Sequence, residues 1–216
     1  AAVREITPRG IMLMENCYYS NLGIPCSTPR LIYRDGKAEP QFAFTPHGYD
    51  LTVDTDAYQG ASNNRVDVIY EEHLRTQERL NCPVLVGEWG AGDGKAEEIP
   101  HLAHLLDLFD RNLWSQTYWA YATEKLNRPL MDLLSRPYPQ AVTGHIQSFC
   151  YDREKRLFTL EYEQEKPYSV PTAIYLPRPF QSIEADGSYR VEREEGHAAR
   201  LLLDTGIGYH KVTLQF

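Results

Sequence analysis

The sequence contains few cysteines, and none is arranged as in a structural metal site. The four cysteines are Cys17, Cys26, Cys82 and Cys150, and no two of them form a CxxC pair. Structural zinc sites use closely spaced cysteines and histidines, so we expect no metal site. Cys17 and Cys26 are close enough along the chain to bridge across a loop, but free thiols fit the same spacing.

Long apolar runs and excess positive charge are also missing. No stretch approaches the roughly 20 apolar residues that a membrane-spanning helix needs. The formal net charge is −8, which gives a nucleic acid no long-range attraction, so DNA and RNA are not expected partners. The first residues lack Met and show no charged-then-apolar leader. We expect residue 1 to be an internal point of a longer parent chain, a processed end or an artificial boundary; localisation stays open, and a secreted or membrane-associated protein fits equally.

What the chain does contain is enough apolar residues for a core, arranged in an alternating pattern. Of its 216 residues, 42% are hydrophobic. Amphipathic helical patterns at 63–81 and 97–114 lie among four short apolar segments: "GIMLMEN", "PQFAFTPHGYD", "CPVLVGEWG" and "SQTYWAYAT". Strands that alternate with helices in this way predict a parallel sheet with right-handed crossovers.

The pattern changes near Pro137 and Pro139. Beyond them, segments such as "HIQSFCYDREKRLFTLEYEQ" and "TAIYLPRPF" read as short strands broken by charged, Gly and Asp-Gly turns, without a helical pattern. We therefore predict a domain boundary there and a small antiparallel β-sandwich over residues 137–216. A role in supporting the preceding domain is favoured for it over lipid or sugar binding.

Polar and aromatic residues follow each predicted strand of the first part. In parallel α/β folds the loops after the strands open on one face, where active sites gather. Taken singly, such residues are usually solvated loop groups, structural histidines or core tryptophans, but four consecutive strands that all carry them favour a site. The residues are Glu15 and Asn16, His47 and Tyr49, Glu88 and Trp89, and Trp119 and Tyr121.

These motifs resemble those of glycoside hydrolase family 5. "PVLVGEWG" is similar to the nucleophile strand of that family, "FAFTPHGYD" to its His-x-Tyr strand, and "TYWAY" to its final strand with a sugar-stacking tryptophan. With "IMLMENCYYSNLGIPCS" and "RPYPQAVTGHIQSFCYD", the chain resembles the endoglycoceramidase-related branch, whose members cleave glycosphingolipids or related glucolipids. The resemblance implies an α/β plus all-β chain: the C-terminal half of a (β/α)8 TIM barrel over residues 1–136, then the β-sandwich.

The resemblance also implies roles for individual residues. Glu88 would be the nucleophile of a retaining β-glycoside hydrolase, with Tyr49 hydrogen-bonded to it and His47 as a further polar group of the active site. Trp119 would form the floor beneath the sugar, because an indole face packs on the apolar face of a pyranose. We expect no metal and no organic cofactor. The expected substrate is a glycolipid or oligosaccharide, with peripheral contact to lipid surfaces.

One element of the family pattern is missing. A retaining glycosidase needs a second carboxylic acid about 5–5.5 Å from the nucleophile, and the family's Asn-Glu-Pro-like motif that carries it is not found here. The resemblance therefore implies an N-terminal half, in the same parent chain or a separate one, without which this fragment is inactive. Glu15 and Glu124 are nearby carboxylates; Glu15 is the better stand-in, although a substrate-facing or structural role is favoured for it.

Further substrate contacts are expected from Trp89, Glu15 and Asn16, beside Trp119. A different class of function is also open, because Trp119, Trp89 and the tyrosines could form the aromatic platform of a non-catalytic glycolipid- or carbohydrate-binding fragment. The sequence leaves open whether the aglycone is ceramide, sterol or sugar, and whether cleavage is endo or exo.

Overall fold

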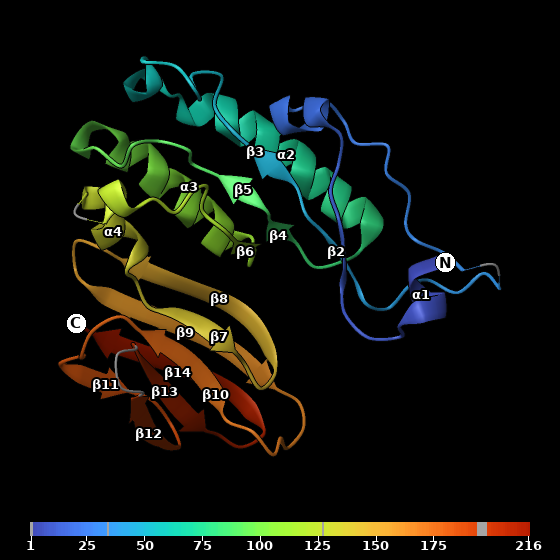
Figure 1. The fold of residues 1–216 in the computed structure, drawn as a ribbon. Coiled ribbons are helices and arrows are strands. Elements are labelled where there is room, and N and C mark those ends of the chain that lie inside the picture. Colours follow the sequence, from blue (N-terminus) through green and yellow to red (C-terminus); the bar gives the residue numbers. More distant parts are fainter. Residues whose placement is uncertain (1, 34, 127, 194–197) are drawn as a thin grey trace. The chain divides into compact units, whose positions relative to one another are not determined.

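The computed structural model describes residues 2–33, 35–126, 128–193 and 198–216, and it divides into two compact units (Figure 1). The first unit comprises Ala1–Phe109 with Trp114–Leu130, and the second comprises Asp110–Leu113 with Met131–Phe216. The first contains helices and short parallel strands, and the second is built of antiparallel strands. The predicted order, an α/β part followed by an antiparallel β part, is confirmed.

The elements up to residue 134 alternate along the chain. The helices and 3₁₀ turns are α1 (Ala2–Ile6), η1 (Tyr18–Leu22), η2 (Tyr58–Gly60), α2 (Asn63–Leu80), η3 (Ala96–Glu98), α3 (Ile99–Arg111), η4 (Thr123–Lys125) and α4 (Pro129–Leu134). The strands are β1 (Met12–Met14), β2 (Phe42–Phe44), β3 (His47–Gly48), β4 (Leu85–Val86), β5 (Glu88–Trp89) and β6 (Ser115–Gln116).

The strands of the first unit pair in parallel, in chain order. β1 pairs with β2, β3 with β5, and β4 with β6. Parallel bridges from Phe44 to Val84 and from Gly90 to Trp119 join these short ladders to one another. Within the described residues the strands do not close into a barrel. Because the paired strands are parallel, their carboxyl ends lie along one common edge.

Helix α2 is amphipathic and buries one face. Val66, Ile69, Tyr70, His73 and Leu80 are buried at the spacing of successive helical turns. The helix ends at Leu80, and Asn81 caps it in a left-handed backbone conformation (φ 48°).

Helix α3 buries four large apolar residues of the amphipathic pattern expected at 97–114. They are Leu102, Leu105, Leu106 and Phe109. Phe109 meets Tyr70 and Trp89 edge-on, with ring centroids 5.1 and 5.2 Å apart. The core of the first unit is therefore an aromatic cluster between its helices and strands.

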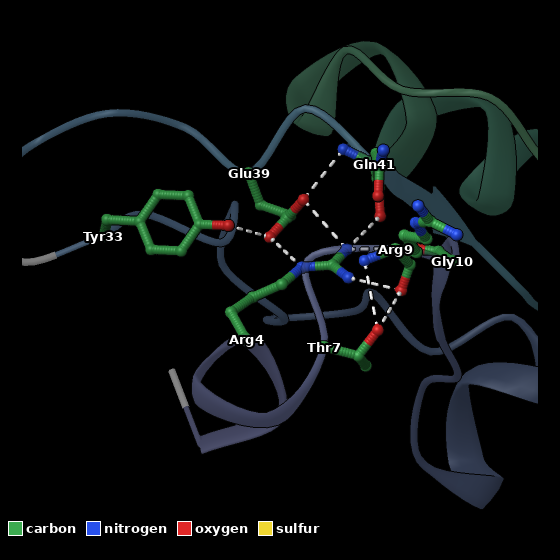
Figure 2. A network of polar contacts seen from close by, with 7 residues as sticks. All are labelled: Arg4, Thr7, Arg9, Gly10, Tyr33, Glu39 and Gln41. Atoms are coloured by element: carbon green, nitrogen blue, oxygen red, sulfur yellow. Dashed lines mark hydrogen bonds and ion pairs between the residues drawn. The ribbon is translucent and has the colours of Figure 1, made fainter.

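A polar network fastens the segment before β2 to helix α1 (Figure 2). Arg4 makes a two-pronged hydrogen bond to Glu39, with Nε–Oε2 and Nη2–Oε1 distances of 2.9 and 3.0 Å. The Tyr33 hydroxyl donates to the same carboxylate, and so does the backbone N–H of Gln41. The hydrogen bonds from Arg4 and Tyr33 lower the pKa of Glu39 to about 2. Glu39 is therefore a charged structural anchor at neutral pH.

The second unit consists of two four-stranded antiparallel sheets. Their strand orders are β12-β13-β10-β7 and β11-β14-β9-β8. The strands are β7 (Tyr138–Ala141), β8 (His145–Asp152), β9 (Leu157–Gln164), β10 (Thr172–Leu176), β11 (Ser182–Glu184), β12 (Ser188–Arg193), β13 (Ala199–Asp204) and β14 (Gly208–Gln215). One hydrophobic cluster joins the two sheets and includes Phe158, Leu160, Ile174 and Leu203. This arrangement is the predicted sandwich.

Candidate active site

His47 and Glu88 lie directly across from each other at the ends of two parallel strands. The register of β3 and β5 pairs His47 with Glu88 and Gly48 with Trp89. The peptide N–H of Gly87 donates to the carbonyl oxygen of Pro46 at 2.9 Å, which holds the strands together just before the pair. The parallel pairing therefore brings the two residues together.

The carboxylate of Glu88 is held by two side chains. The Tyr49 hydroxyl donates to Glu88 Oε2 at 2.8 Å, and His47 Nδ1 lies 3.4 Å from the same oxygen. Burial first, and then the hydrogen bond to Glu88, raises the pKa of Tyr49 well above its usual range. Tyr49 therefore keeps its proton and donates to the carboxylate. The Glu88 side chain is 30% exposed, so solvent and ligands reach it.

Glu15 brings a second carboxylate to the same histidine. Its Oε1 lies 3.5 Å from His47 Nδ1, and its side chain is 56% exposed. Since Nδ1 of His47 faces both Glu15 and Glu88, the imidazole lies between the tips of β1 and β5. Glu15 is thus close to the nucleophile candidate, as its place after the neighbouring strand predicts.

Two residues outside the predicted set fix the position of His47. The carbonyl oxygen of His47 accepts a hydrogen bond from His73 Nε2 at 2.8 Å. Burial lowers the pKa of His73 to about 4, so a neutral ring makes this bond. Gly87 leaves room for the imidazole, because a Cβ at this position would lie 2.8 Å from His47 Nε2 and 2.9 Å from Thr45 Cγ2.

Trp119 continues the parallel edge next to Glu88. The backbone N–H of Trp119 donates to the carbonyl oxygen of Trp89 at 3.0 Å, and the carbonyl oxygen of Trp119 accepts from the backbone N–H of Ala91 at 2.8 Å. The residue is 52% exposed, and the peptide bond after it is cis. Tyr121, two residues later, is more exposed still. Trp119 therefore presents an indole surface on the strand neighbouring the one that carries Glu88.

Two predicted contact residues lie in the interior. Trp89 is fully buried, and its indole N–H donates to Gln116 Oε1 at 2.5 Å. It also meets Tyr118 edge-on. Asn16 is 9% exposed, and its side-chain atoms have no hydrogen-bond partner among the described residues. In the described residues these two side chains face the interior, and their contact with substrate stays a prediction.

The sequence carries one signal for His73. It lies three residues after Tyr70 and four after Ile69, on the apolar face of α2. A histidine on such a face needs a hydrogen-bond partner inside the protein. Which partner it finds, the carbonyl of His47, depends on how α2 packs against β3.

No metal site is seen in the described part of the chain, where no three His, Cys, Asp or Glu side chains are grouped to hold an ion. No disulfide joins any two of the four cysteines, all of which lie in the described ranges. Among the described helices, none combines the length and the apolar character needed to cross a bilayer.

Comparison with protein families accounts for most of the chain. Residues 1–125 match the model of cellulase (glycosyl hydrolase family 5), and residues 136–211 match the glycoside hydrolase family 5 C-terminal domain. The chain belongs to glycoside hydrolase family 5. This confirms the resemblance drawn from the motifs around His47, Glu88 and Trp119. Among curated protein sequences the comparison finds no match.

Solved structures of other proteins share the fold. Endo-glycoceramidase II from Rhodococcus sp., in complex with a cellobiose-like imidazole, matches with a TM-score of 0.80 at 19% identity, over 99% of this chain and 51% of that one. Its ganglioside GM3 complex matches with a TM-score of 0.77 at 18% identity, over 99% and 51%. Sterylglucosidase 1 from Cryptococcus neoformans matches with a TM-score of 0.56 at 16% identity, over 81% and 38%. The chain thus spans about half the length of the endo-glycoceramidase structures.

Proposed function

We propose that the chain carries the nucleophile side of a retaining β-glycoside hydrolase that acts on glycolipids. The observation that carries the proposal is the hydrogen bond from Tyr49 to Glu88 on a partly exposed strand end. A donor of this kind holds the carboxylate in one orientation. An oriented and accessible carboxylate is what the first step of a retaining glycosidase requires.

In the proposed reaction, the Glu88 carboxylate attacks the anomeric carbon of the sugar. The bond from that carbon to the aglycone oxygen breaks as the new ester bond forms, and the leaving oxygen takes a proton from a second carboxylic acid. Water, deprotonated by the same group, then attacks the anomeric carbon and releases Glu88. His47 keeps Glu88 oriented through the contact at Nδ1, and Glu15 faces the substrate beside it.

Trp119 is proposed as the floor beneath the bound sugar. The half-exposed indole is next to Glu88 along the parallel edge. An indole face packs against the apolar face of a pyranose ring and so orients the anomeric carbon, without taking part in proton transfer.

We further propose that the first unit is the C-terminal half of a barrel and that an N-terminal half supplies the acid/base. The parallel strands β1 to β6 run in chain order without closing in the described residues, which supports this. The family relatives with this fold are about twice as long. Glu15 is close to Glu88 through His47, but its position after β1 better suits a contact with substrate.

Glycolipids are proposed as the substrate class because of the relatives. The structures that share the fold over nearly the whole chain are those of an endo-glycoceramidase, one of them with ganglioside GM3. A sterylglucosidase shares it more distantly. The common feature is a sugar linked to a lipid.

The decisive experiment labels the nucleophile without needing the acid/base. A 2-deoxy-2-fluoro-β-glucoside with a dinitrophenyl leaving group needs no protonation to depart, so Glu88 alone can attack and stay esterified. We expect intact mass spectrometry to show one added fluoroglucosyl group on the full chain, peptide mapping to place it on Glu88, and Glu88→Gln to remain unlabelled. Tyr49→Phe should be labelled about 10 to 100 times more slowly, because the donor that orients the carboxylate is lost.

The same experiment separates the enzyme from a binding fragment. Glu124→Gln, which alters an exposed carboxylate of η4, is the matched control and should be labelled like the unmodified chain. A chain that binds glucosylceramide with unchanged affinity after Glu88→Gln, and that takes no label, would replace the hydrolase proposal with the non-catalytic alternative.

A further inference from the structure

The loop after β1 has no charged side chain and exposes apolar ones. Between Glu15 and Arg30, residues 16–29 contain no Asp, Glu, Lys, Arg or His, in a chain that has 52 Lys, Arg, Asp and Glu residues in total. Tyr18, Tyr19 and Ile24 are each more than half exposed. We refer to residues 16–29 as the uncharged loop. Exposed apolar side chains gathered on one segment are characteristic of an interaction surface.

The backbone of the uncharged loop is firmly held from helix α2. The Arg79 guanidinium donates to the carbonyl oxygens of Cys26 and Thr28, both at 2.7 Å. Gly23, with φ 88°, lies against Ile69, since a Cβ built on it would be 3.6 Å from that residue. Backbone hydrogen bonds close the turn at η1. The exposed side chains therefore project from a fixed support and are not simply part of an unanchored loop.

The composition of the loop suits a lipid–water interface. Tyr18 and Tyr19 meet edge-on, with centroids 5.9 Å apart, and together form an aromatic surface. Tyrosine rings prefer the headgroup region of a bilayer, where the ring is in an apolar setting and the hydroxyl stays wet. A segment without charges enters this region at little desolvation cost. The net charge of −8 disfavours anionic lipids, so the matching surface is electrically neutral.

The loop also lies at the edge of the molecule that carries the candidate site. It follows Glu15 directly, and η1 packs against β3, which carries His47, and against α2 (Figure 1).

We propose that the uncharged loop docks the protein on a neutral lipid–water interface, with Tyr18, Tyr19 and Ile24 among the headgroups. The inference deepens the proposed function and rests on it, because the sugar of a glycolipid lies at that same interface. Docking there brings the edge that holds Glu88 to the depth at which the sugars are displayed. The protein then takes its substrate from the membrane surface.

The test is flotation of the full chain with phosphatidylcholine vesicles that contain no glycolipid. We expect the unmodified chain to bind, with little dependence on salt concentration because no charges are involved. Tyr18→Ser/Tyr19→Ser should reduce the partition coefficient at least about tenfold, since two rings that bind among the lipid headgroups are lost. Ile24→Asn should reduce it less. Tyr168→Ser/Tyr189→Ser, which changes two exposed tyrosines of the second unit, is the matched control and should bind as the unmodified chain does.

The other outcomes separate failure of the docking proposal from failure of the proposed function. If the double variant floats like the unmodified chain, or the unmodified chain does not float, the loop is not a lipid surface. If floating requires glucosylceramide, the site at Glu88 makes the contact, and the proposed function stands without the docking surface. If the double variant instead changes the mass in solution, the loop contacts a second copy. Vesicle binding without labelling of Glu88 would remove the proposed function and leave the docking surface.

Discussion

The polar side chains of the candidate site differ from those in the core of the second unit. In the second unit, buried polar groups satisfy one another: the Thr143 hydroxyl donates to Gln164 Oε1 at 3.1 Å, and Thr205 donates to the same oxygen at 3.0 Å. In the first unit, Glu88, Glu15 and His47 are only partly buried at a strand edge. A closed polar network adds specificity to a core, whereas an open one keeps capacity for a ligand.

Their strands differ in the same sense. Strands β8, β9 and β14 are eight residues long, and β9 alternates between buried and half-buried positions along its length. The strands of the first unit have two or three residues, and the pairing is interrupted near Pro46 and Gly87. The long strands of the second unit enclose a core, whereas the short strands of the first unit end at an edge that presents side chains.

The largest effect is expected from breaking the core of the second unit. Phe158 is fully buried in the cluster that joins the two sheets. Phe158→Ala should lower the free energy of unfolding by about 3–5 kcal/mol, because it removes transfer free energy and leaves a cavity. Chemical denaturation measures the loss, with the exposed Tyr209→Ala as control. Hydrogen exchange should show α2 still protected; equal loss of protection in both units would mean that they unfold as one.

A slightly smaller effect is expected from acid on the first unit. Burial lowers the pKa of His73 to about 4, whereas an unfolded histidine has a pKa near 6.5. Between these values the unfolded chain binds a proton that the folded chain does not. Stability is therefore full above about pH 6.5 and falls down to about pH 4, by roughly 3 kcal/mol.

His73→Gln checks this prediction, because its amide can still donate to the carbonyl of His47. Denaturant midpoints measured from pH 7 to pH 4 should fall less steeply in the variant than in the unmodified chain. An identical slope would show that other groups cause the acid sensitivity.

A more local disturbance is expected at Gly87. The Cβ of Gly87→Ala would lie 2.8 Å from His47 Nε2, so the imidazole must move, at a cost of about 1–3 kcal/mol. We expect the rate at which the fluoroglucoside labels Glu88 to fall about tenfold. Gly60→Ala is the control, since nothing lies within 4 Å of a Cβ there. Unchanged labelling in Gly87→Ala would argue against a role for the position of His47.

The smallest effect is expected at the network in Figure 2. The pKa of Glu39 is lowered to about 2 by Arg4 and Tyr33, so its contribution is present above the range of an unfolded carboxyl group and is lost as the pH falls towards 2. Glu39→Gln should speed amide exchange in residues 37–41 at neutral pH, while Asp35→Asn, at an exposed neighbour, should not. Equal exchange in both variants would show that the ion pair does not hold this segment.

Much of the fold could be predicted because it depends on local patterns. The apolar stripe of α3 is buried as its spacing indicates, and the alternation in β9 gives a sandwich strand. On α2 the apolar spacing predicts burial less well: Leu74 is only half-buried, while His73 lies in the core. Helical periodicity places a residue on a face, but the packing partners decide which residues at the margin are covered.

The candidate site was predicted in part for the same reason. Glu88, Tyr49, His47 and Glu15 follow apolar strands, and parallel pairing brings them together. Trp89 and Asn16 also follow such strands, yet their side chains lie in the interior. Successive residues of a strand point to opposite faces, so a residue next to a site residue usually faces the other way, and the sequence does not show which of the two faces the open edge.

By itself, then, the sequence determined the order of the two units, the strands that carry the polar residues, and family membership through motifs around His47, Glu88 and Trp119. Only the tertiary structure decided that His73 holds the backbone of His47 and that Arg79 supports the uncharged loop. Local composition sets how each segment folds, whereas contacts between residues far apart in the chain depend on strand register and helix packing, which no single segment encodes.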